Sequence, residues 1–162
     1  MRRSGLFFCF VSGLFSLLSC AQKKMPEGEL VRLELTHSGT MAGYRYEGRV
    51  MQDSTGTFVL RAMKENYGPL FEKKIDAEAM KQFRQIIEEE RMYKYKEAYR
   101  PKFEVLDGSS WSFKAVFSDG SDISSHGYNA GPKGNGLERI VAFMDELIQD
   151  GILIENPETI ED

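Results

Sequence analysis

The chain has 162 residues, of which 41% are hydrophobic and 28% are charged. This length and composition are typical of one globular domain, and they exclude an intrinsically disordered chain and a protein with several membrane spans. The 21 basic and 25 acidic side chains give a net charge of −4 at pH 7, which argues against nucleic-acid binding because that function needs a basic surface.

Residues 1–19 have the three parts of a secretory signal peptide. Two arginines precede an apolar run over 6–18, which is short for a membrane-spanning helix. The run ends in the sequence LLSC, whose last residue is Cys20, and this end resembles the lipobox of bacterial lipoproteins. The resemblance implies cleavage before Cys20 by signal peptidase II and attachment of lipid to its sulfur. The alternative is an ordinary secretory signal followed by a chance cysteine.

The resemblance also predicts the location of the mature protein. Similar lipoproteins carry three acyl chains on this cysteine, which implies a permanent membrane anchor. Cleavage would remove two arginines and Cys9, leaving 19 basic and 25 acidic side chains, a net charge of −6, and a body without disulfides. Ala21 stands where some inner-membrane lipoproteins have aspartate, and 22–24 lack the acidic cluster of some surface lipoproteins. These features favour an outer-membrane protein facing the periplasm, if the host is Gram-negative.

The body begins with strand patterns. Residues 20–28 are expected to be the lipidated cysteine and a tether, and 29–151 a single folded domain. Apolar and polar residues alternate over 30–36, which is expected to be the first strand. The stretches 44–51, 57–64 and 71–75 are expected to be the next strands. The stretch 37–43, between the first two strands, is expected to be a turn.

Two helices are predicted, one after the first group of strands and one near the end of the chain. Asp76 is a good N-cap for a helix that continues to about Tyr93. Asn135 with Glu138 resembles a capping box for a second helix, 135–149. Residues 152–162 are expected to be an acidic tail. The element order predicts an α+β domain: an antiparallel sheet of about six or seven strands with two helices packed on one face.

The stretch 111–117 alternates with the period of a half-buried strand and starts a hairpin. Trp111, Phe113 and Phe117 share one face, and Asp119-Gly120 supplies the turn. A two-residue turn would place His126 on the aromatic face. A three-residue loop would instead pair residue 117 with 121, bring Ile123 to the core face and turn His126 to the other face. We favour the second register because it buries Ile123.

The run after this hairpin carries the most varied polar chemistry in the chain. His126, Tyr128 and Asn129 lie in it, and Lys133 follows before the second helix. We take these four residues as the candidate ligand- or partner-binding site. The glycine-rich stretch 131–136 lacks Walker spacing, and Lys133 could at most help it to bind a small anion at the helix N-terminus.

Other chemistry is poorly represented in the sequence. The body has two distant histidines and no thiol beyond that of Cys20, which argues against a metal site, and no cofactor is expected. Ser125 and His126 are neighbours on a predicted strand, so they point to opposite faces and cannot act as nucleophile and base. The tyrosines at 93, 95 and 99, with their basic neighbours, could form a sugar or peptide platform, or could pack in part on the sheet.

The body is also similar to small uncharacterised domains of lipoproteins from Bacteroidetes and related bacteria. In these domains an aromatic strand, an Asp-Gly turn and a Gly-Tyr-Asn-x-x-Pro loop precede a last helix, as they do here at 111–117, 119–120 and 127–132. The resemblance implies no activity.

The sequence thus predicts a lipid-anchored envelope lipoprotein with a non-catalytic binding domain for a protein partner or an envelope glycan. It has two alternatives. One is a hydrolase of envelope material that uses His126, and the other is a purely structural component of the envelope.

Overall fold

The computed structural model describes residues 23–39, 45–63, 68–103 and 107–154. The predicted signal peptide, Cys20 and most of the expected acidic tail lie outside the described residues. The described strands and helices, in chain order, are β1 (Leu30–Ser38), β2 (Arg45–Gln52), β3 (Phe58–Met63), β4 (Leu70–Ile75), α1 (Ala77–Glu89), η1 (Met92–Lys94), β5 (Ala98–Tyr99), β6 (Ser110–Phe117), β7 (Asp122–Tyr128), α2 (Gly136–Ile148) and β8 (Ile152–Ile154).

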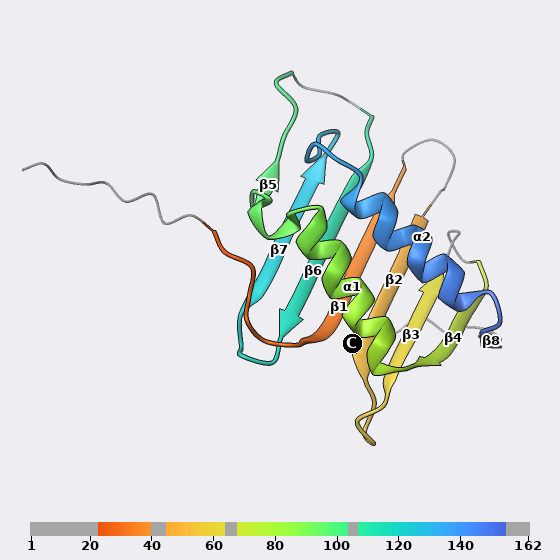
Figure 1. Ribbon diagram of the computed structural model, residues 1–162. Coiled ribbons are helices and arrows are strands. Elements are labelled where there is room, and N and C mark those ends of the chain that lie inside the picture. The colour runs from red at the N-terminus through yellow and green to blue at the C-terminus, as the bar shows by residue number, and fades with distance from the viewer. Residues whose placement is uncertain (1–22, 40–44, 64–67, 104–106, 155–162) are drawn as a thin grey trace, which may run out of the picture.

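The strands form one mixed sheet in the order β5-β7-β6-β1-β2-β3-β4-β8 (Figure 1). The pair β5–β7 is parallel, and the other pairs are antiparallel. This confirms the predicted α+β class and the largely antiparallel sheet. The described sheet has eight strands, more than expected, because β5 and β8 have two and three residues. Strands this short show no alternation in the sequence, and β8 occupies the first three residues of the stretch expected to be the tail.

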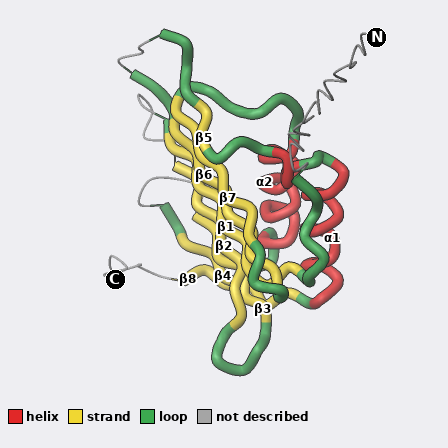
Figure 2. Tube along the Cα trace, turned by 90° about the vertical axis from the view of Figure 1, so that its left-hand side faces the viewer, coloured by secondary structure: helices red, strands yellow, loops and turns green. Residues whose placement is uncertain are grey.

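Figure 2 shows α1 and α2 on the same side of the sheet. We call this side the helix face and the opposite side the outer face. The side chains on the helix face form the core, with Leu33, Tyr46, Leu60 and Phe113 at most 1% exposed. Burying such side chains is the main stabilising contribution in a domain of this size. None of the helices in the described ranges is long and apolar enough to cross a membrane.

Helix α1 begins and packs as its sequence predicts. The Asp76 carboxylate accepts a hydrogen bond from the Ala79 N–H at 2.9 Å, which satisfies one of the free donors at the helix start. Its buried stripe is Ala79, Met80, Phe83, Ile86 and Ile87. The helix ends at Glu89 and not near Tyr93, because Arg91 takes a left-handed conformation with φ of 52°. A short 3₁₀ turn, η1, then carries Met92 into the core.

Helix α2 packs through Ile140, Met144 and Ile148. The predicted capping box at its start is wrong, because the Asn135 side chain makes no capping hydrogen bond. Instead, Gly136 lies against the hydroxyl of Tyr95, which a Cβ on Gly136 would approach to 2.6 Å. The missing side chain at Gly136 therefore lets α2 begin directly over the buried Tyr95.

The hairpin of β6 and β7 has the predicted three-residue turn. The Phe117 N–H donates to the Ser121 carbonyl at 3.0 Å, and Gly120 has a left-handed φ of 82°, which glycine adopts without strain. Ala115 pairs with Ile123, and Ser112 pairs with His126. Ile123 is buried and His126 is exposed on the outer face, so the favoured register is confirmed.

The buried phenol of Tyr95 makes the stability of this fold depend on pH. Burial, together with the charges of Tyr99, Glu90 and Glu138, raises the pKa of Tyr95 to about 12, against about 10 in an unfolded chain. Below pH 10 the phenol is neutral in both states. Between these two pKa values the unfolded chain loses its proton first, so the free energy of unfolding falls as the pH rises.

We therefore expect Tyr95→Phe to remove a loss of about 1 kcal/mol per pH unit between pH 10 and pH 12. Urea unfolding of the wild type and the variant across this range measures the difference. Parallel pH profiles for the two proteins would contradict the assignment.

Candidate functional site

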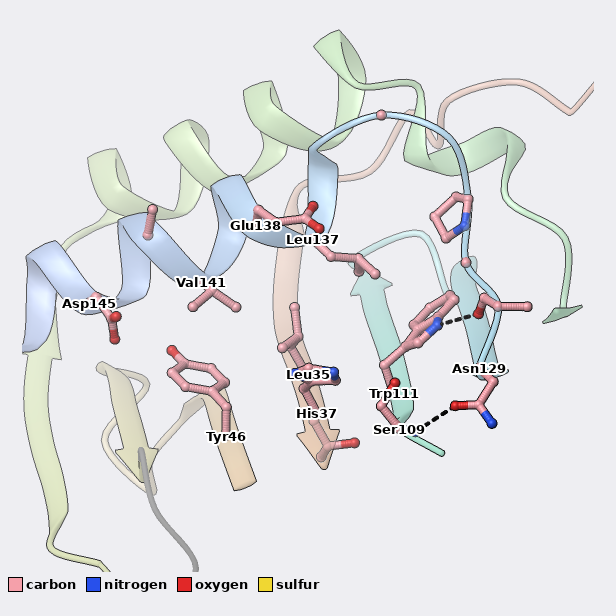
Figure 3. A pocket seen from close by; sticks show the side chains of 16 residues that line it. Leu35, His37, Tyr46, Ser109, Trp111, Asn129, Leu137, Glu138, Val141 and Asp145 are labelled. Atoms are coloured by element: carbon pink, nitrogen blue, oxygen red, sulfur yellow. Dashed lines mark hydrogen bonds between the residues drawn. The ribbon is translucent and has the colours of Figure 1, made fainter. Parts of the chain in front are cut away.

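A cleft of about 650 Å³ lies on the helix face, between α2 and one end of the sheet (Figure 3). Its floor comes from β1, β2 and β6, one wall comes from α2, and the loop 129–134 closes one side. Figure 3 shows the rings of Tyr46, His37 and Trp111 below the side chains of Leu137 and Val141. A concave site with an apolar lining and a few polar groups is the usual form of a ligand site.

The floor is one row of ring side chains across three neighbouring strands. His37 of β1 pairs with Tyr46 of β2 on one side and with Trp111 of β6 on the other. Directly opposite residues of neighbouring strands point to the same face, and this is the face that buries Leu33 and Leu35. The three rings therefore lie side by side beneath α2.

This row was not predicted, because β1 continues to Ser38 and does not end at residue 36. His37 and Ser38 belong to the strand and not to the expected turn. Both residues are polar, so the apolar–polar alternation that marks the strand disappears just where it reaches the cleft. Continuing the alternation past Thr36 would have placed His37 on the helix face.

Trp111 is the only tryptophan of the chain, and its indole ring is fixed from several sides. Its Nε1–H donates to the Ala130 carbonyl at 2.8 Å. The ring of Tyr99 packs against it with a centroid distance of 5.7 Å. Gly127, its partner on β7, has no Cβ, and one placed there would collide with the indole and with the Ala130 carbonyl.

Asn129 lines the cleft, but its side chain holds the loop in place. Its Oδ1 accepts the Ser109 N–H at 2.7 Å, and its Nδ2 donates to the Asp107 carbonyl at 3.3 Å. Its own N–H donates to the Ser109 carbonyl at 2.8 Å. Asn129 has a φ of 48°, a left-handed conformation that asparagine tolerates better than most residues.

The structure does not bring the four sequence-predicted site residues together. His126 and Tyr128 are exposed on the outer face of β7, whereas Asn129 lies at the cleft. Lys133 is exposed and does not line the cleft, although its two neighbours do. The strand β7 ends at Tyr128, and Asn129 begins the following loop with a left-handed backbone, so residues close in this sequence lie on two surfaces.

Ser125 and the three tyrosines of the expected platform lie in the same region. Ser125 is buried on the helix face, where its Oγ donates to the Lys96 carbonyl at 2.6 Å, while His126 points outward, so they form no nucleophile–base pair. Of the proposed tyrosine platform, Tyr95 is buried, and Tyr93 and Tyr99 pack partly against the core. These tyrosines act mainly as packing residues.

The wall from α2 gives the cleft its charge. Glu138 and Asp145 line it and are seven residues apart, which is about 10 Å along a helix. The described residues that line the cleft include no lysine and no arginine. Elsewhere in the described part of the chain, no three His, Cys, Asp or Glu side chains cluster as metal ligands would.

The role of Gly127 can be tested with the single tryptophan as reporter. Gly127→Ala should break the bond between Trp111 and Ala130, shift the fluorescence emission of Trp111 to longer wavelength and destabilise the fold by about 1–3 kcal/mol. Gly131→Ala is the matched control, because a Cβ there would approach the indole nitrogen only to 3.6 Å, an ordinary contact. Equal emission spectra for the two variants would show that Gly127 does not position Trp111.

Comparison of the chain with protein-family models, with curated proteins and with solved structures found no match.

Proposed function

We propose that the chain is a lipid-anchored lipoprotein of the cell envelope whose domain binds a partner without catalysis, and that the cleft beside α2 is its binding site. The observation that carries the proposal is the fixed Trp111 ring on the floor of an apolar cleft. Large aromatic rings contribute most of the contact energy in many recognition sites. A ring already held by Ala130 and Tyr99 loses little conformational freedom when a ligand binds.

The alternative hydrolase that uses His126 has less support. His126 lies on the outer face, away from the cleft, and its neighbour Ser125 points to the core. The residues of β6 opposite and diagonal to His126 on the same face, Ser112 and Lys114, offer no carboxylate. Glu34 and Glu47 line the same outer-face depression as His126, but they form ion pairs with arginines. A binding role for the cleft needs none of these groups.

The anchor is proposed from the lipobox-like end of the leader, and contacts of the following residues bear on its geometry. Lys23 donates through Nζ to the Tyr95 carbonyl at 2.8 Å, and Arg84 donates to the Pro26 carbonyl at 3.0 Å. The tether is thus packed on the domain from Lys23 onward. Only Ala21 and Gln22 lie between Cys20 and Lys23, and these three residue steps reach at most about 11 Å, so a lipid on Cys20 would keep the domain near the membrane surface.

Mass spectrometry of the membrane-extracted protein tests the anchor. We expect a mature chain that begins at an acylated Cys20 in the wild type, and an unlipidated product from Cys20→Ala. An unlipidated wild-type protein that is released without membrane extraction would contradict this part of the proposal.

Titration of Trp111 fluorescence tests the binding site. The probes are soluble peptidoglycan fragments and short peptides with basic, neutral or acidic side chains. We expect a saturable change of emission with at least one class of probe, and weaker binding by Val141→Phe, which fills the cleft with an apolar ring. Val116→Phe, on the outer face, is the matched control. No saturable change with any class, or equal weakening by both variants, would reject the cleft as the site.

A further inference from the structure

The polar and charged groups around the cleft indicate what kind of ligand it takes. We infer that the cleft binds an ammonium group at the end of an aliphatic stem, as in the lysine side chain of a peptide partner. The inference rests on the proposed binding function and goes further by assigning the ligand chemistry.

Two hydrogen-bonding side chains of the cleft are already used within the domain. The indole N–H of Trp111 is used by the Ala130 carbonyl. Both ends of the Asn129 amide are used by the backbone of Asp107 and Ser109, just before β6. A glycan needs several such groups to orient its hydroxyls, because each buried hydroxyl without a partner costs free energy. The internal use of these groups therefore favours a ligand that is mostly apolar.

Aliphatic side chains line the cleft above and below. Leu35 lies on the floor, and Leu137 and Val141 project from α2 above the rings (Figure 3). Leu137 and Val141 are only partly buried against the core, so they keep apolar surface that a ligand can cover. Each methylene group buried there contributes about 0.8 kcal/mol, so an aliphatic stem lying against these side chains would be stabilised.

A carboxylate gives the cleft a negative charge. Glu138 lines the cleft in the first turns of α2 and forms no ion pair within the described ranges. Its neighbour Arg139 is directed to α1, where it pairs with Glu89 at 2.9 Å and Glu90 at 2.8 Å, and therefore does not neutralise it. A carboxylate at the rim and an indole face on the floor both attract a cation. An anionic ligand would meet this carboxylate with no lysine or arginine among the described lining residues.

The test uses three probes and the fluorescence of Trp111 in the full domain. The first probe is the peptide acetyl-Gly-Lys-Gly-amide, the second is the same peptide with norleucine in place of lysine, and the third is a glucosamine disaccharide. We expect saturable binding of the lysine peptide, and binding of the norleucine peptide weaker by about tenfold because it lacks the charge.

Glu138→Gln should weaken binding of the lysine peptide by about fivefold, the effect of one partly exposed ion pair, and should leave binding of the norleucine peptide unchanged. Glu146→Gln is the matched control, since it removes the same charge from an exposed position of α2 that does not line the cleft. Binding of the lysine peptide should also weaken as salt is added.

Three other outcomes would contradict the inference in different ways. Equal binding of both peptides, with equal effects of the two glutamine variants, would overturn the ammonium assignment but leave the cleft as a binding site. Binding of the glucosamine disaccharide alone would overturn the lysine side chain as the source of the ammonium group. No binding of these probes, with a response to an acidic or neutral fragment that Val141→Phe abolishes, would overturn the inference while the proposed function stands.

Discussion

The register of β2, β1 and β6 determines what this domain presents on each side of its sheet. The pairing of His37 with Tyr46 and with Trp111 sets three rings in one row beneath α2. The three-residue turn between β6 and β7 adds Gly127 to the same row, where its missing Cβ leaves room for the indole. A shift of any of these strands by one residue would move its side chains to the opposite face, and the cleft would lose part of its floor.

The packing of the loop and of α2 on the sheet thus determines the shape of the cleft. The groups that this packing does not use determine which ligand the cleft can bind. Holding the loop 129–134 over the sheet uses the indole N–H of Trp111 and the amide of Asn129. Packing α2 on the core uses Ile140 and Met144. The indole face, the flanking apolar side chains and the carboxylate of Glu138 are what remains for a ligand. Because these groups suit a cationic and mostly apolar ligand, we propose that the domain binds such a ligand.

The sequence predicts the fold better than the site. Alternation and helical stripes were sufficient for six strands, both helices and the hairpin register. Most of these elements bury apolar side chains at a regular spacing, as β6 does with Phe113 and Phe117. They failed for β5 and β8, which are too short to show a period. The site depends on pairing between strands that are distant in the chain, and His37 and Trp111 are far apart in sequence. The chosen residues, from His126 to Lys133, are neighbours in sequence, but β7 ends at Tyr128 and the loop that follows lies on another surface.

The most direct test of the account is an amide NMR chemical-shift map of the domain, recorded with a probe that changes the emission of Trp111. The account predicts the largest shifts at the indole N–H of Trp111 and at the backbone amides of His37, Leu137 and Val141, which surround the cleft. The largest shifts at His126 and Tyr128, on the outer face of β7, would contradict it and would return the binding site to the residues chosen from the sequence.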